Sequence, residues 1–176
     1  MATSPATPPS YHPHSLDELQ SLIIEWGASK GLLARSKEQA LAQHGKTEEE
    51  IEELKKAIAA FKAFGSYSNL KEVRLEAGDV LVTLVLQAEI QGLSFADCLG
   101  GPNQPVDGAR LAFFANRLKD QINRERVAAQ HISSVAHRLE WLVAPWNLEP
   151  VDCLEAAWCK IRDRTGRTVG GVFIKD

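Results

Sequence analysis

An almost wholly apolar helix is predicted for residues 72–90, which read EVRLEAGDVLVTLVLQAEI. The apolar residues keep helical spacing and cover nearly the whole circumference, which is typical of a helix enclosed by other elements. Ser68 or Asn69 is expected to cap its N-terminus, and Gly92 is expected to end it. A helix this apolar needs covering on several sides.

One narrow polar stripe interrupts this apolar surface. Glu76 and Asp79 lie on it at i, i+3 spacing, one helical turn apart, with apolar positions on both sides. The complete stripe consists of Glu72, Glu76, Asp79, Thr83 and Gln87. Burying an ionised carboxylate without a partner is costly, so acids bordered by core on both sides need counter-charge.

A second acid pair is expected on the preceding helix, which the sequence places between a cap at Ser36 and a stop at Gly65. Glu50 and Glu53 share the inward face of this helix with apolar residues, so both are expected to point into the bundle. The inward faces offer little counter-charge beyond Lys46. Two neighbouring helices are therefore expected to bring four carboxylates together.

A divalent cation would supply the missing charge. Ligands that are all carboxylate oxygens suit Mg²⁺ or Mn²⁺, which commonly bridge protein carboxylates to substrate phosphates. The acids therefore indicate phosphate chemistry, with Mg²⁺ as the predicted cofactor and Mn²⁺ as its substitute. A solvated or salt-linked acidic surface is the alternative, because i, i+3 acid pairs are common on charged helices.

The remainder of the chain predicts an all-α domain. Residues 1–14 are rich in proline and small polar residues and are expected to form a mobile arm, whereas residues 15–176 are expected to form one domain. The Gly- and Pro-rich residues 100–108 predict a connection. Further helices are predicted from Ser15, with Glu18 completing its cap, to about 27–31, and for residues 109–123, 126–143 and 151–164. The last residues predict a turn and a short extended segment in which Val172 and Ile174 share one side.

Composition excludes several classes of function. Lys and Arg number 20 against 23 for Asp and Glu, a formal net charge of -3, so nucleic-acid binding is not expected. No apolar run is long enough to cross a bilayer and no signal peptide is recognisable, so we expect a cytoplasmic protein without a membrane partner. Cys98, Cys153 and Cys159 lack disulfide or zinc-site spacing and are expected to be buried.

Four motifs follow one another along the chain. They are Gln43-x-x-Lys46-x-x-Glu49-Glu50-x-x-Glu53-Leu54, Glu76-Ala77-Gly78-Asp79-Val80, Trp158-x-Lys160-Ile161-x-x-Arg164-x-Gly166 and Gly171-Val172-Phe173-Ile174-Lys175. In this order, with Trp26 and Gly31-Leu32-Leu33 upstream, they resemble the MazG-like all-α nucleoside triphosphate pyrophosphohydrolases, including short members encoded by phages. The resemblance touches about two-thirds of the chain.

The resemblance implies an all-α, Mg²⁺-dependent hydrolase that cleaves a nucleoside or deoxynucleoside triphosphate to a monophosphate and pyrophosphate. The implied metal ligands are Glu50, Glu53, Glu76 and Asp79. The expected catalytic acids are Glu50 and Glu53, assisted by Glu49. The cations expected near the phosphates are Lys46, Lys160 and Arg164.

Three expectations keep alternatives open. Trp26 is a candidate to stack on the nucleobase, although its spacing with Leu22 and Ile23 equally predicts a core residue. Residues 100–149 depart from the short family members and are expected to form an inserted helical segment, either a hairpin at a dimer interface or a degenerate second half of the bundle. We expect a homodimer or larger oligomer, and the alternative function is a non-catalytic interaction or regulatory module with an acidic face.

Overall fold

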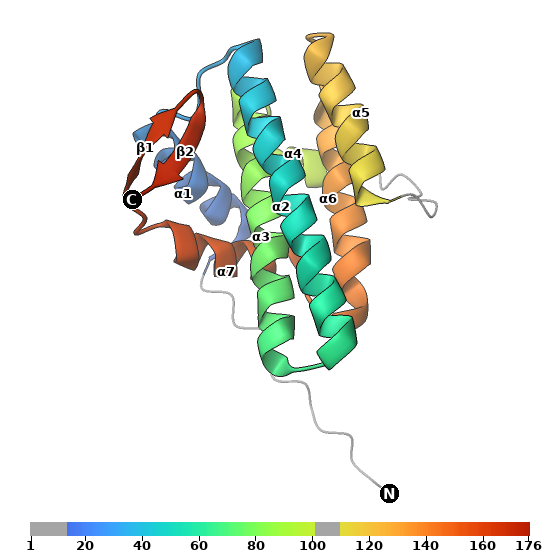
Figure 1. Cartoon of the computed structure of the whole chain (residues 1–176). Helices are drawn as coiled ribbons and strands as arrows, with labels where there is room; N and C mark the ends of the chain where they lie inside the picture. Colours follow the sequence, from blue (N-terminus) through green and yellow to red (C-terminus); the bar gives the residue numbers. More distant parts are fainter. Residues whose placement is uncertain (1–13, 101–109) are drawn as a thin grey trace, which may run out of the picture.

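The computed structural model describes residues 14–100 and 110–176, and within them the fold is all-α, as predicted. Four long helices lie side by side, and a short two-stranded sheet lies at one edge (Figure 1). The helices are α1 (Leu16–Ser29), α2 (Lys37–Phe64), α3 (Tyr67–Ile90), α4 (Phe95–Leu99), α5 (Leu111–Asn123), α6 (Ala129–Val143) and α7 (Pro150–Ile161). A 3₁₀ turn (Ala144–Trp146) follows α6, and the strands are β1 (Gly166–Val169) and β2 (Val172–Lys175).

Local capping sequences define the first two helices. The Ser15 hydroxyl accepts from the Glu18 N–H while the Glu18 carboxylate accepts from the Ser15 N–H, which completes the predicted capping box of α1. The Ser36 hydroxyl accepts from the Gln39 N–H and so caps α2, and Gly65 ends this helix in the left-handed conformation at φ 62°. These boundaries follow the sequence prediction because both caps are made by nearby residues.

The start of α3 was predicted two or three residues too late. Ser66 is the cap, since its hydroxyl accepts from the Asn69 N–H, and the expected caps Ser68 and Asn69 lie inside the first turn. The end agrees with the prediction, because Gly92 follows the last turn with a positive φ of 71°. The helix is therefore slightly longer than its sequence pattern predicts.

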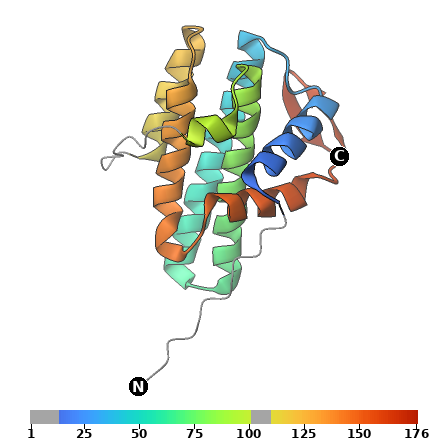
Figure 2. The same ribbon diagram turned by 180° about the vertical axis from the view of Figure 1, so that it is seen from behind.

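Helix α3 is covered from several directions within one chain. Every residue from Glu76 to Ala88 is buried, and α1, α2, α4, α6 and α7 all contact this helix. Figure 2 shows α1 and α7 crossing the long helices on the side away from α5. The apolar surface that led us to expect an oligomer is thus enclosed without a second copy, and the oligomeric state remains a prediction.

The expected inserted segment forms a helical hairpin. Helices α5 and α6 pack on each other, α5 contacts α2, and α6 contacts α3. Their buried faces are mostly apolar and include Leu118, Ile132 and Leu139, although α6 also buries Ser133 and Arg138. The predicted connection at 100–108 and the predicted arm at 1–14 lie outside the described residues, apart from Gly100 and His14. Helix α4, which is only five residues long, was not predicted.

The C-terminal residues form an antiparallel β-hairpin in which Val169 pairs with Val172 and Gly166 with Lys175. The Gln39 side-chain amide donates to the Gly171 carbonyl over 2.9 Å, which ties the hairpin to α2. The predicted extended segment is therefore paired with the residues preceding it and attached to the helices.

Two further expectations concern the rest of the chain. No helix in the described residues is both long and apolar enough to span a membrane. Cys98 and Cys153 are buried as expected, but Cys159 is exposed, so that part of the cysteine prediction was wrong. Its position near the C-terminal end of α7 places it outside the packed face that buries Cys153.

Candidate metal centre

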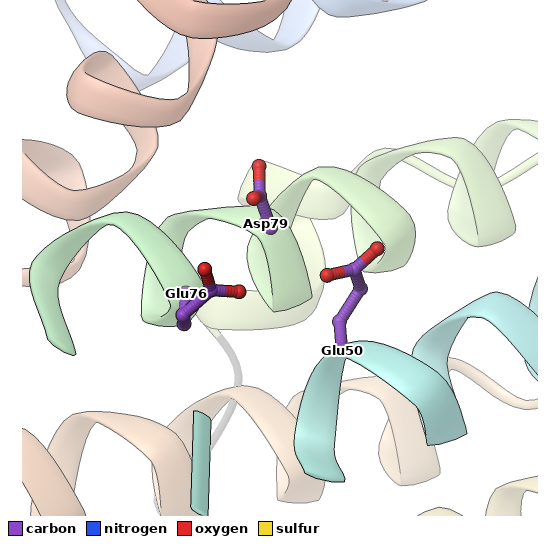
Figure 3. A group of neighbouring side chains, drawn as sticks. All are labelled: Glu50, Glu76 and Asp79. Atoms are coloured by element: carbon purple, nitrogen blue, oxygen red, sulfur yellow. The ribbon is translucent and has the colours of Figure 1, made fainter. Parts of the chain in front are cut away.

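Three carboxylates from two helices meet in the bundle. Glu50 comes from α2, and Glu76 and Asp79 come from successive turns of α3 (Figure 3). One oxygen from each side chain lies within 4.8 Å of the other two. The i, i+3 spacing brings the two α3 acids to one face, and the packing of α2 on α3 directs Glu50 toward them. We refer to Glu50, Glu76 and Asp79 as the acid cluster.

Burial changes the proton affinity of this cluster. The side chains of Glu50, Glu76 and Asp79 are 15%, 8% and 11% exposed. Burial, reinforced by the charge of Asp79 and opposed by that of Lys160, raises the pKa of Glu76 from 4.5 to about 7. Burial also raises the pKa of Glu50, although the nearby Lys46 ammonium opposes the shift. The oxygen Oε2 of Glu76 is buried and accepts no hydrogen bond.

Two lysines lie against the acid cluster. Lys160 Nζ is 2.6 Å from Asp79 Oδ2 and 4.0 Å from Glu76 Oε1. Burial alone would lower the pKa of Lys160, but the hydrogen bond to Asp79 and the acidic charges outweigh burial and raise it. Lys46 Nζ is 2.6 Å from Glu49 Oε2 and 3.3 Å from Glu50 Oε1. The sequence prediction had named only Lys46 as counter-charge for the inward acids.

A glycine allows Lys160 to reach the cluster. Where α7 crosses α3, a Cβ atom on Gly78 would lie 2.0 Å from the Cys153 carbonyl oxygen and 2.7 Å from the Ala157 Cβ. Only glycine permits this close backbone approach without a shift of one helix. The residue between Glu76 and Asp79 in the motif therefore sets the position of the helix that carries Lys160.

Two residues of the acid cluster, Glu50 and Asp79, line a cavity of about 460 Å³, whereas Glu76 lies behind them and does not line it. The cavity lies between α1, α2, α3, the C-terminal end of α7 and strand β2, and it has a charged side and an apolar side. The charged lining residues are Lys46, Glu49, Glu50, Glu53, Asp79, Lys160, Arg164 and Lys175. The apolar wall contains Trp26, Leu32, Val82, Leu86, Phe173 and Ile174.

The structure brings together most of the residues predicted for the site. Glu50, Glu76 and Asp79 form the acid cluster, but Glu53 is exposed and does not belong to this group of close ligand atoms. Glu53 nevertheless lines the same cavity as Glu50, and its charge contributes to raising the pKa of Glu50 and of Glu76. The expectation that Glu53 is buried with Glu50 was therefore wrong, and its role as a metal ligand stays a prediction. Glu49 is also exposed, and it pairs with Lys46.

All three predicted phosphate-binding cations, Lys46, Lys160 and Arg164, line the cavity, and so does Trp26. The Trp26 ring meets Phe173 edge-on at 5.5 Å between centroids, which makes it part of the apolar wall. Sequence reasoning assigned no role to Phe173 and Lys175, although both belong to a quoted motif. Their position depends on how the C-terminal hairpin folds back on α1 and α2, which helical spacing does not predict.

Comparison of the chain with family models, with curated proteins and with solved structures finds no match. The resemblance to MazG-like pyrophosphohydrolases therefore remains a prediction from the motifs.

Proposed function

We propose that this chain is a Mg²⁺-dependent nucleotide pyrophosphohydrolase that cleaves a nucleoside or deoxynucleoside triphosphate to monophosphate and pyrophosphate. One observation carries the proposal: two carboxylates of the acid cluster, Glu50 from α2 and Asp79 from α3, line a cavity that also has four cationic side chains and an aromatic wall. In a metal-bound nucleotide, the acids would meet the metal, the cations would meet the phosphates, and the apolar surface would meet the base. The order of the motifs in the sequence supports the same reaction.

The residues of the acid cluster fit a hard divalent cation. All three supply carboxylate oxygens, which are the ligands that Mg²⁺ and Mn²⁺ prefer. Burial, reinforced by the charge of Asp79, raises the pKa of Glu76, and its buried Oε2 accepts no hydrogen bond from the described residues, so a bound cation would stabilise the ionised form of this carboxylate. When bound, Mg²⁺ would supply positive charge that lowers the barrier to attack on a phosphate.

The other charged residues of the cavity have roles that follow from their charge and position. Lys46, Lys160 and Arg164 bind and orient the phosphate oxygens. Water attacks the α-phosphorus, the bond to the β-phosphate oxygen breaks, and pyrophosphate leaves. Glu49 and Glu53, which line the cavity outside the acid cluster, are placed to accept the proton that the attacking water loses.

The apolar wall accommodates the nucleobase. Trp26 and Phe173 present aromatic surface on the side of the cavity away from the acids. Base stacking on an aromatic side chain tolerates any base, so the wall supports a nucleotide substrate without selecting one base. The second expectation for Trp26, a core residue, is compatible with this role because the ring is only half-buried.

The burial of the acids argues against the alternative of an acidic docking face. Glu76 is 6% exposed and Asp79 8% exposed, so neither is presented to a protein partner. Carboxylates that bind a partner electrostatically belong on an accessible surface. This burial therefore favours a cation site over an interaction module.

Pyrophosphate release from a panel of nucleoside and deoxynucleoside triphosphates with Mg²⁺ tests the proposal. Glu76→Gln and Asp79→Asn should each reduce kcat/KM by more than about 100-fold, because loss of a ligand should exceed the 10- to 100-fold cost of losing a group that only supports one. Omitting Mg²⁺ should have the same effect on the wild-type protein.

Glu52→Gln is the matched control. Glu52 lies on α2 beside Glu53, is exposed, and pairs with Lys55 away from the cavity. This variant should retain wild-type turnover. Equal turnover in wild type, Glu76→Gln and Asp79→Asn would disprove the site, and absence of pyrophosphate release from every triphosphate would disprove the activity.

A further inference from the structure

Lys160 occupies the position at which a cation would meet the acid cluster. Its Nζ lies 2.6 Å from Asp79 Oδ2 and 4.0 Å from Glu76 Oε1. The side chain reaches these oxygens from α7, across the close approach at Gly78. Lys160 is therefore the ion-pair partner of two of the three cluster acids, and Lys46 is the partner of the third.

We propose that the Lys160 ammonium is a built-in counter-ion of the acid cluster and that a divalent cation must displace it in order to bind. This inference rests on the metal site of the proposed function and concerns how that site is filled. It predicts that Lys160, although close to the ligands, weakens metal binding.

Charge and geometry oppose simultaneous binding of Lys160 and a divalent cation to the acid cluster. Mg²⁺ binds oxygen at about 2.1 Å and requires nearly ideal octahedral geometry. A cation bound by the three carboxylates, whose ligand oxygens lie within 4.8 Å of one another, would share Asp79 with an ammonium that already contacts it and that lies 4.0 Å from Glu76. Two positive charges this close repel, and each oxygen directed at the ammonium is partly withdrawn from the metal.

Lys46 differs from Lys160 in its partners. Its shortest ion pair, 2.6 Å, is with Glu49, which does not belong to the acid cluster. Its contact with Glu50 is longer, at 3.3 Å, and Lys46 and Glu50 both belong to α2. Lys46 can keep Glu49 as its partner when a cation binds, whereas Lys160 has only cluster acids as ion-pair partners among the described residues.

Displacement gives Lys160 a second partner. The side chain also lines the cavity, together with Arg164, so an ammonium released from Asp79 stays beside the space that the phosphates would fill. A bound metal frees the Lys160 ammonium from Asp79 and so makes it available to a phosphate. A bound phosphate holds Lys160 away from Asp79 and so frees the acid cluster for a metal. Each ligand therefore favours binding of the other. Lys160 is thus a residue that couples the two parts of the substrate complex.

Titration calorimetry of the metal-free full chain with Mn²⁺ alone tests the proposal. Lys160→Met retains the aliphatic stem and removes the charge, and it should bind Mn²⁺ at least about 10-fold more tightly than wild type. Lys160→Arg keeps a competing cation and should remain within about 2-fold of wild type. Lys175→Met is the matched control, because Lys175 also lines the cavity but forms no ion pair with any described residue.

The possible outcomes separate this inference from the proposed function. Tighter binding by Lys160→Met alone supports displacement. Equal or weaker binding by Lys160→Met, with binding abolished by Asp79→Asn, overturns displacement and leaves the metal site standing. Failure of all variants, Lys160→Met included, to bind Mn²⁺ overturns both.

Discussion

The two long helical hairpins of this chain, α2–α3 and α5–α6, are alike in architecture and different in chemistry. Both are pairs of packed helices, and they lie side by side in the two opposite views (Figures 1 and 2). In α2–α3, buried polar and charged residues follow one stripe of α3. In α5–α6, the buried residues are apolar except for Ser133 and Arg138, and none of them is an acid. Among the described residues, the only set of three clustered metal-ligating side chains belongs to α2–α3.

The difference between the two hairpins shows how the free-energy cost of burying carboxylates is offset. Carboxylates in a bundle interior are destabilising unless they are paired, and the apolar contacts of the neighbouring helices must compensate for them. Helix α5 covers α2, and α6 covers α3, without contributing any residue to the lining of the cavity. One hairpin therefore carries the candidate chemistry, and the other contributes stability.

The largest expected effect tests this division of roles. Leu118 is fully buried on α5, so Leu118→Ala should reduce the free energy of unfolding by about 2–5 kcal/mol. Urea denaturation measures the loss. Under conditions in which the variant is folded, pyrophosphate release should remain close to wild type, and a folded variant with no activity would contradict the view that α5 only supports the site.

Gly78→Ala should have the next largest effect and act on both properties. The added Cβ meets the Cys153 carbonyl oxygen, so α7 must move away from α3, at a cost of about 1–3 kcal/mol. Because α7 carries Lys160, the Lys160–Asp79 contact should also be lost. Thermal unfolding and a crystal structure of the variant would measure these effects, and unchanged stability would show that the close approach is less tight than described here.

The pH dependence of stability should report the burial of Glu76 in the α2–α3 hairpin. The pKa of Glu76 is about 7 in the folded chain and 4.5 ordinarily, so the folded state binds this proton more tightly. Protonation of Glu76 therefore stabilises the folded state. This contribution to the free energy of unfolding is complete below about pH 4.5 and is lost as the pH rises toward 7. Burial lowers the pKa of His44 from its ordinary value of 6.5, so His44 reduces the free energy of unfolding as the pH falls below 6.5. The effect of Glu76 must therefore be measured against a variant that lacks only the Glu76 carboxyl.

Glu76→Gln provides that comparison. In the presence of EDTA, the Tm of wild type relative to Glu76→Gln should fall between about pH 5 and about pH 8. Mg²⁺ should raise the Tm of wild type at the higher pH and have little effect on the variant. Parallel pH profiles for the two proteins would mean that Glu76 titrates normally.

The smallest expected effect is that of removing the charge of an exposed acid on the α5–α6 hairpin. Glu140 on α6 is exposed and pairs only with His137 among the described residues. Glu140→Gln should change stability by less than about 0.5 kcal/mol and leave turnover within about 2-fold. A large loss of activity in the kinetic assay would show that α6 contributes to the site.

The parts of the fold that depend on nearby residues were predictable from the sequence. The capping pairs that begin at Ser15 and Ser36 defined two helix starts. At α3, the sequence analysis named Ser68 and Asn69 as caps, but the side chain that is used belongs to Ser66, because the helix begins before its apolar pattern becomes regular. Five residues are too few to show helical periodicity, so α4 could not be recognised.

The parts of the site that depend on residue spacing within one helix were predictable from the sequence. Spacing within one helix placed Glu76 and Asp79 together, and their apolar flanks indicated burial. Which of Glu50 and Glu53 faces α3 depends on the rotation of α2 about its axis, a property of packing between helices. The contact between Lys160 and Asp79 joins residues 81 positions apart and depends on how α7 crosses α3, so spacing could place Lys160 near the site but not on the acid.

The exposed thiol of Cys159 has a practical consequence for studying this chain. The other two cysteines are buried, so a maleimide dye added to the folded wild-type protein should attach at one position without any engineering. Burial and the nearby Glu155 carboxylate raise the pKa of this thiol, so the coupling should be run at mildly alkaline pH. The dye would sit next in sequence to the lysine that contacts Asp79, where a change in fluorescence could be followed in real time as ions or nucleotides are added.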